Sequence, residues 1–130
     1  MKHLLDVNVL LAAIWSNHSL HGSAFSWLEG KTIVLCPLAE LGFLRISTNK
    51  KAINAPMGKA RELLEKFSRE RNAERIWRIW DDLPPLNSNP KKSEQVTDLC
   101  LAELAAMHGL KFAIFDGQIP HSAVELITPP

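Results

Sequence analysis

Two aspartates each stand directly after a short apolar run, and their placement suggests chemistry. Asp6 closes the run at residues 2–6, and Asp116 follows the run at residues 112–115. A short apolar run that ends at an acid is typical of a buried strand whose last side chain leaves the core. In parallel α/β sheets, ligands bind outside the carboxyl ends of the strands. Both carboxylates are therefore candidates for a site at that edge of a sheet.

Two further acids belong to elements that would end near the same edge. Glu40 stands four residues after Cys36, the end of a β-branched apolar run, and lies one turn into a predicted helix. Asp98 stands early in a predicted C-terminal helix, with Thr97 beside it. Four carboxylates that converge raise one another's pKa unless a cation neutralises them. Mg²⁺ and Mn²⁺ suit such a site because they prefer carboxylate and water oxygens.

Each acid taken alone has an ordinary structural explanation. An aspartate after a strand is often a helix cap or a turn residue. Asp98 alone fits an acid that the helix dipole favours near a helix N-terminus. The joint pattern of four acids, rather than any single one, indicates a metal site.

The rest of the pattern predicts the elements that would position these acids. Apolar runs predict strands, and apolar residues at helical spacing predict helices. Three residues mark helix ends: Asn8 as a cap, Pro37 at a first helical position and Gly109 as a stop signal. Strands are expected at residues 2–6, 32–36, 112–115 and 124–127, and helices at 9–15, 19–28, 38–47, 57–71 and from 93 or 94 to 108. Residues 76–80 fit either a helix end or a short strand. Alternating strands and helices predict a parallel sheet with helices on both faces.

Length and composition favour one globular domain. The chain has 130 residues, and its 46% apolar and 22% charged residues exclude a disordered protein. Cys36 and Cys100 are too few for a disulfide framework. The N-terminus reaches Asp6 before a signal-peptide core could form, and no apolar run is long enough to span a membrane. We expect a small soluble protein of a reducing cytoplasm, with no membrane association.

Charge is distributed unevenly, although the net charge is only +1. Residues 42–75 hold nine Lys and Arg against four acids, whereas residues 93–130 hold one Lys against five acids. Arg45, Lys50 and Lys51 follow Glu40 closely, so they are candidates for contact with a phosphate backbone. Solvated loop charges explain these three residues equally well.

Four segments resemble the motifs of a PIN domain. They are residues 4–12 (LLDVNVLLA), 36–45 (CPLAELGFLR), 97–102 (TDLCLA) and 112–116 (FAIFD). Their order, spacing and total length are similar to those of the VapC-type toxins of bacterial toxin–antitoxin pairs. The resemblance covers nearly the whole chain. It implies a single PIN-like domain at residues 1–130, with a three-layer α/β/α fold around a central, mostly parallel sheet.

The resemblance also implies a function and a set of site residues. The family acts as Mg²⁺- or Mn²⁺-dependent endoribonucleases, which implies a cytoplasmic toxin that hydrolyses RNA phosphodiester bonds with a metal-activated water. Asp6, Glu40, Asp98 and Asp116 would then be the catalytic and metal-binding quartet. The family's usual partners are RNA, a cognate antitoxin and a second copy in a homodimer.

Three more positions bear on the quartet in this resemblance. Asn8 stands where the family commonly keeps a small polar residue next to the metal, and Thr97 matches a polar position beside the third acid. The family often has Thr or Ser two residues before the fourth acid, whereas this chain has Ile114. That departure removes a hydroxyl near the site but removes no ligand.

Three other functions remain as alternatives. One is a catalytically inactive PIN-fold module that binds RNA or protein, although such a module has no need of four acids. Another is an α/β phosphatase with a nucleophilic aspartate after its first strand, but these enzymes need a second acid where Asn8 stands. The third is a flavodoxin-like carrier, which the absence of a phosphate-binding loop after the first strand disfavours.

Overall fold

A computed structural model of the chain describes residues 2–70, 76–79 and 90–128. The strands are β1 (Lys2–Leu5), β2 (Thr32–Leu35), β3 (Ile76–Arg78), β4 (Lys111–Ile114) and β5 (Val124–Leu126). The helices are α1 (Val7–Ile14), α2 (His21–Leu28), α3 (Pro37–Thr48), α4 (Met57–Glu70) and α5 (Val96–Met107), with a short 3₁₀ helix η2 (Ser93–Gln95) before α5. The ambiguous segment forms the strand β3, while Trp80 lies outside the described residues.

The five strands form one sheet in the order β3-β2-β1-β4-β5, and each neighbouring pair is parallel. From β1 the chain builds outward through β2 and β3, then returns to place β4 against the other side of β1. The topological switch point therefore lies between β1 and β4, where the α/β rule places a ligand crevice. This is the edge at which β1 leads into Asp6 and β4 leads toward Asp116.

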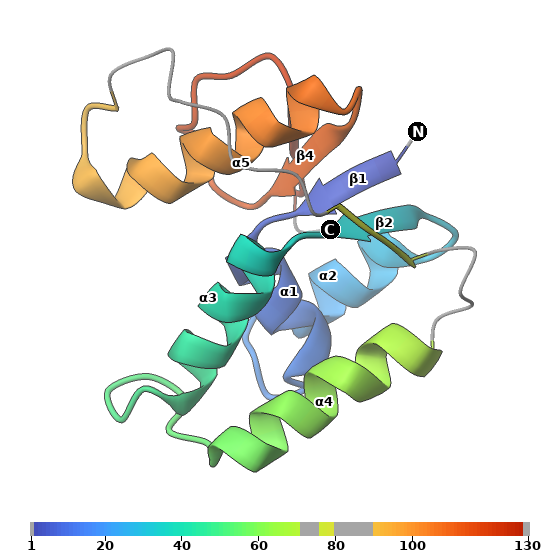
Figure 1. The fold of residues 1–130 in the computed structure, drawn as a ribbon, viewed down its shortest axis with the longest axis vertical. Helices are drawn as coiled ribbons and strands as arrows, with labels where there is room; N and C mark the ends of the chain where they lie inside the picture. The colour runs from blue at the N-terminus through green and yellow to red at the C-terminus, as the bar shows by residue number, and fades with distance from the viewer. Residues whose placement is uncertain (1, 71–75, 80–89, 129–130) are drawn as a thin grey trace.

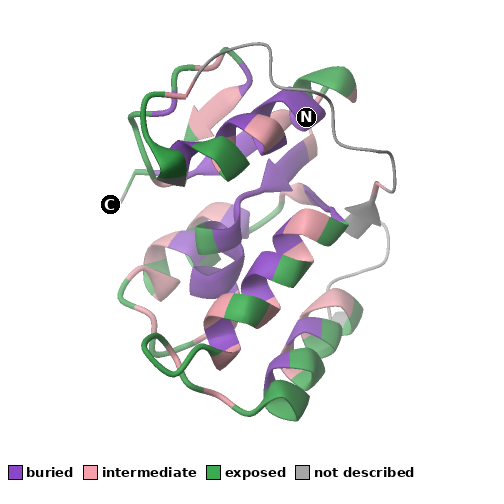
Figure 2. Cartoon of the chain, turned by 60° about the vertical axis from the view of Figure 1, so that its left-hand side comes forward, coloured by how far each residue is buried: buried purple, intermediate pink, exposed green. Residues whose placement is uncertain are grey.

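Helices cover the sheet on both faces, which confirms the predicted three-layer α/β/α fold. In Figure 1, α5 lies on one face, against β1 and β4, and α1 to α4 lie on the other. On that second face α1 packs against β4, α2 and α3, and α4 packs on the outside against α3 and α1. Sheet and inner helix surfaces are buried, while the outer helix surfaces are exposed (Figure 2).

Local sequence accounts for most of the helix and strand boundaries. The central strands β1, β2 and β4 are buried over their last three residues, as expected of parallel strands covered on both faces. Pro37 occupies the first turn of α3, where its missing N–H leaves no intrahelical hydrogen bond unmade. Gly109 follows α5 with φ +68°, a left-handed conformation that glycine adopts without strain.

Two local predictions were wrong in detail. Helix α1 is capped by Asp6 rather than by Asn8, because the Asp6 carboxylate accepts a hydrogen bond from the N–H of Asn8. Residues 93–95 form the 3₁₀ helix η2, so α5 itself begins only at Val96. Within the part of the chain that the structure describes, no helix is long and apolar enough to cross a membrane.

Candidate active site

The site is built around Asp6, which lies between β1 and α1. Its backbone N–H donates to the carbonyl oxygen of Ala113 on β4, 3.1 Å away. Its carboxylate accepts from the N–H of Asn8 at 3.2 Å. Only 2% of Asp6 is exposed, although an ionised carboxylate is costly to bury. Capping alone does not require this burial, since most caps are solvated.

A second carboxylate meets Asp6 from the opposite layer of the fold. Asp98 stands in the first turn of α5 and is half-buried. Because α5 packs on β1 and β4, its N-terminal turn brings Asp98 within hydrogen-bonding reach of the Asp6 side chain. The structure therefore joins two acids that are more than ninety residues apart in the sequence.

The two carboxyls change each other's protonation. Burial raises the pKa of Asp6 well above its ordinary value, and repulsion by Asp98 raises it further. Burial is also the main cause that raises the pKa of Asp98, while its hydrogen bond with Asp6 acts in the opposite direction. Both carboxyls therefore resist ionisation while they lie together in the fold. Mutual repulsion is present as expected, but burial is the larger cause of the raised pKa values.

Asp116 adds a third negative charge near the pair. It stands two residues after β4, is exposed, and accepts a hydrogen bond from the N–H of Gln118 at 2.9 Å. Its charge contributes to the raised pKa of Asp98, so the two carboxylates lie within electrostatic range. Asp116 thus stands beside the Asp6–Asp98 pair at the solvent-facing edge of the sheet.

Glu40 takes a different position from the other three acids. It lies in the first turn of α3, is half-buried, and lines an open cleft of about 410 Å³ between α3 and α4. Glu40 is not among the causes that raise the pKa of Asp6 or Asp98. Its charge instead acts on Cys36, where it adds to the larger effect of burial in raising the pKa of the thiol.

The remaining predicted site residues are all on the surface. Asn8 and Thr97 are exposed, next to Asp6 and Asp98 respectively in the chain. Arg45 is exposed on α3.

Lys50 and Lys51 are exposed in the turn after α3, where the N–H of Lys51 donates to the side chain of Asn49. Their predicted contact with RNA stays a prediction.

Gly42 is a site-building residue that the sequence analysis did not single out. A Cβ atom added to this α3 residue would lie 2.7 Å from Cγ2 of Val7, closer than real contacts allow. Val7 is buried and directly follows Asp6. The missing side chain therefore lets the helix that carries Glu40 pack closely on the start of α1. The sequence signal was present, since a glycine inside a helical pattern lowers helix stability unless packing requires it.

The donor chemistry fits a divalent cation. Asp6, Asp98 and Asp116 offer only carboxylate oxygens, which hard cations such as Mg²⁺ and Mn²⁺ prefer. A cation would also relieve the repulsion that raises the pKa of Asp6. Within residues 2–70, 76–79 and 90–128, however, no three His, Cys, Asp or Glu side chains are arranged closely enough to hold a metal ion. Asp6 and Asp98 are the part of the donor set already in contact.

Comparisons with known proteins identify the family of the chain. The PIN domain family matches residues 3–124. Among curated relatives, ribonuclease VapC38 of Mycobacterium tuberculosis is 33% identical, over 96% of this chain and 97% of its own length. Ribonuclease VapC44 of the same species is 33% identical over 95% of this chain and 92% of its own length, and ribonuclease VapC39 is 30% identical over 95% and 94%.

Proposed function

Because this chain belongs to the PIN-domain family, with VapC-type ribonucleases as relatives along nearly its full length, we propose that it is itself a ribonuclease. More specifically, the proposal is a Mg²⁺- or Mn²⁺-dependent endoribonuclease that hydrolyses RNA phosphodiester bonds. All of residues 1–130 would act as one PIN-like domain. The enzyme would work in the cytoplasm as the toxin of a type II toxin–antitoxin pair.

One observation carries the proposal: a buried aspartate contacts a second aspartate at the topological switch point of a parallel sheet. Asp6 is 2% exposed, and its pKa is raised both by that burial and by Asp98. A protein gains no stability from bringing like charges together in its interior. Such a pair is expected where a ligand of opposite charge binds. The strand order places it where α/β proteins bind their ligands.

Each acid has a role in this proposal. Asp6, which follows β1, and Asp98 on α5 would hold the metal, and Asp116 would complete the set from the exposed turn after β4. Glu40 is the fourth acid, presented from α3. When bound, a divalent cation supplies the hydrolytic nucleophile by lowering the pKa of a coordinated water, and its charge offsets the charge that develops on the phosphate.

The surrounding residues keep the acids in place. The N–H of Asn8 donates to the Asp6 carboxylate and would help to orient it toward the metal. The Asn8 side chain and Thr97 are exposed beside the acids and supply polar groups near the metal. Arg45, Lys50 and Lys51 provide positive charge for the RNA backbone on the surface after α3.

The biological setting follows from the same family. An antitoxin would bind the chain and block the acidic site until the antitoxin is removed. A homodimer would be the active form. A small protein encoded beside this chain, which binds it and suppresses its RNA cleavage, would support this part of the proposal.

Cleavage of a labelled RNA by the purified chain tests the central claim. We expect products in Mg²⁺ or Mn²⁺, none after addition of a chelator, and recovery when metal is restored. Thermal melting in the chelator must show that the fold persists, because otherwise the loss would have a trivial cause. RNA binding without cleavage in saturating metal would favour the inactive binding module instead.

A further inference from the structure

The cleft between α3 and α4 has a composition that the acidic site does not explain. Glu40 and Leu44 form its α3 wall, and Arg61, Leu64 and Arg69 are on its α4 wall. Leu64 is only 9% exposed, so the cleft has an apolar floor, whereas both arginines are exposed. The lining also includes the carboxylates of Glu40 on α3 and Glu65 on α4, so the cationic part of the cleft is the arginine pair on α4. Exposed arginines beside an apolar floor suit a flexible anionic chain that carries apolar faces.

The positive charges of Arg61 and Arg69 are available to bind a ligand. They stand eight residues apart on one helix, which corresponds to about 12 Å at about 1.5 Å per residue. Glu65 lies one turn from each, at the spacing of a helical ion pair. Neither arginine nevertheless forms an ion pair with it or with any other acid in the described residues. Their guanidinium groups are therefore free to bind phosphate in two-point contacts.

The cleft shares one residue with the proposed acidic site. Glu40, the fourth acid of the proposed function, is part of its wall. If Glu40 is committed to the metal, the two guanidinium groups outweigh the single carboxylate of Glu65. The separation of the arginines exceeds the rise of about 3.4 Å between successive phosphates of a strand, so each would contact a different phosphate.

From this arrangement we propose that the α3–α4 cleft is the RNA-binding track that leads to the acidic site. Arg61 and Arg69 bind two phosphates of a single-stranded RNA, and Leu44 and Leu64 contact its ribose and base faces. Glu65 opposes this binding and limits its strength. The inference rests on the proposed ribonuclease function and adds a substrate path to it, with residues distinct from Arg45, Lys50 and Lys51.

The test measures the affinity for a fluorescent single-stranded RNA in chelator, where no cleavage occurs, across a series of salt concentrations. Arg61→Gln with Arg69→Gln should weaken binding at least about tenfold. The slope of log affinity against log salt should become shallower by about 1.4, since each phosphate contact on single strands contributes about 0.7. Glu65→Gln should strengthen binding, and Arg61→Lys with Arg69→Lys should keep most of the salt slope.

The matched control removes two charges from the same helix outside the cleft. Lys59→Gln with Lys66→Gln should leave the slope within about 0.7 of that of the wild-type protein. Melting curves must show that every variant folds. An equal loss in the lysine variant, or no loss in the arginine variant, overturns the proposal. So does an arginine variant that binds RNA normally but no longer binds an antitoxin, because the cleft would then be a protein-binding surface.

A separate measurement keeps this inference apart from the function on which it rests. The wild-type protein is assayed for cleavage in Mg²⁺ in parallel. If the wild-type protein cleaves RNA and the arginine variant binds RNA like the wild-type protein, the proposed RNA-binding track is wrong, but the proposed ribonuclease function is retained. If the wild-type protein neither cleaves nor binds RNA, the proposed function fails and the track fails with it.

Discussion

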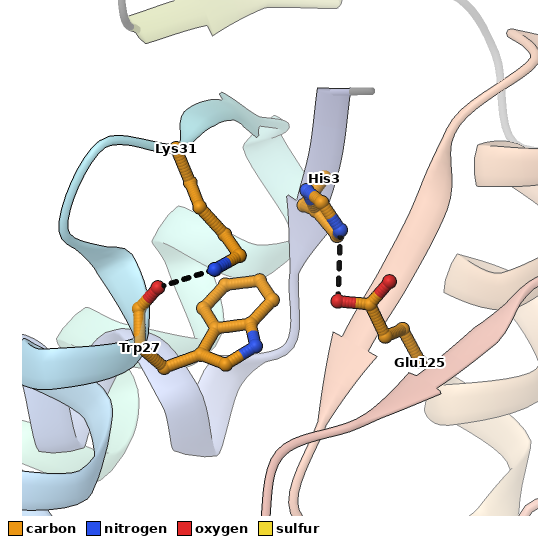
Figure 3. A network of polar contacts seen from close by, with 4 residues as sticks. All are labelled: His3, Trp27, Lys31 and Glu125. Carbon is orange, nitrogen blue, oxygen red and sulfur yellow. Dashed lines mark hydrogen bonds and ion pairs between the residues drawn. The ribbon is translucent and has the colours of Figure 1, made fainter.

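The two ends of strand β1 bury polar side chains in opposite ways. His3, near the start, is 5% exposed, and its Nε2 lies 3.0 Å from Oε2 of Glu125 on β5 (Figure 3). Neither ring nitrogen of His3 has a hydrogen-bond partner among the described residues, and the contact with Glu125 is an ion pair only when the ring is protonated. Trp27 packs edge-on against the His3 ring at 4.9 Å, and Lys31 lies over the indole. Asp6, just past the other end, is 2% exposed and faces another carboxyl, that of Asp98.

The difference separates a structural cluster from a functional one. At the amino end, an aromatic edge and a carboxylate surround a histidine, and Lys31 also donates a hydrogen bond to the carbonyl oxygen of Trp27. Such contacts stabilise the fold without any ligand. At the carboxyl end, two acids meet, and burial together with repulsion by Asp98 raises the pKa of Asp6, so that ionising this pair is costly there. A penalty of that kind persists when function requires it.

The largest expected effect is on catalysis at the carboxyl end. Asp98→Asn should reduce RNA cleavage in saturating Mg²⁺ by more than about a hundredfold. Mutation of a residue that only hydrogen-bonds to a metal ligand already costs about 10- to 100-fold in activity or metal affinity, and Asp98 is proposed as a ligand itself. If Asp98 were merely an acid favoured by the helix dipole, the change would cost at most about 1 kcal/mol of stability and no activity. Cleavage rates and melting curves from the same preparation decide between these outcomes.

Glu29→Gln, at the exposed C-terminal end of α2, is the control for removing one negative charge. It should leave the cleavage rate unchanged. If Asp98→Asn has wild-type activity, Asp98 is not part of the proposed site. The carboxyl end of β1 would then not differ in function from the amino end.

At the amino end we expect the reverse pattern. His3→Ala should lower the free energy of unfolding by about 1 to 3 kcal/mol, since a buried ring and its contact with Trp27 are lost. RNA cleavage should be unchanged at a temperature where the variant is folded. Glu125→Gln should have a smaller effect on stability, because 39% of that side chain is exposed and water can replace the contact. A folded His3→Ala variant that fails to cleave RNA would contradict a purely structural role.

Gly42 tests how closely the elements at the carboxyl end must pack. Gly42→Ala should reduce kcat about tenfold, because the new methyl group would displace Val7, and with it Asp6, relative to the α3 helix. Overpacking of this kind also costs about 1 to 3 kcal/mol, partly offset by the better helix propensity of alanine. Gly22→Ala in α2 is the matched control, because no atom lies within 4 Å of its added Cβ. It should gain stability and keep full activity.

The smallest effect concerns the pH dependence of stability in the absence of metal. The folded protein holds protons on Asp6 and Asp98 above their ordinary pKa of 3.8, so it binds more protons than the unfolded chain. These two groups therefore make the free energy of unfolding fall as pH rises above that value, and they favour folding at lower pH. Urea unfolding at a series of pH values in chelator measures the slope.

Asp6→Asn should make that slope shallower and raise stability at neutral pH, because a neutral amide replaces a buried acid but can still accept from the N–H of Asn8. Added Mg²⁺ should stabilise the wild-type protein at neutral pH more than this variant. If the variant is less stable than the wild-type protein at neutral pH in chelator, the two carboxyls do not repel as inferred.

Local sequence patterns determined the elements and most of their bounds. Apolar runs with β-branched residues marked β1, β2 and β4, because strands buried on both faces need side chains that pack on either side. The same runs showed that Asp6 and Asp116 would leave the core at a strand end. The position of a residue within a strand or helix depends on its neighbours in the chain, so a single sequence is enough to predict it.

Only the tertiary structure decided which acids meet. The strand order β3-β2-β1-β4-β5 places β4 beside β1, and α5 on the opposite layer brings Asp98 to Asp6. The tertiary structure also decided that Glu40 lines the cleft between α3 and α4. The physical reason is that strand pairing and helix packing depend on contacts between residues far apart in the chain, about which local periodicity carries no information.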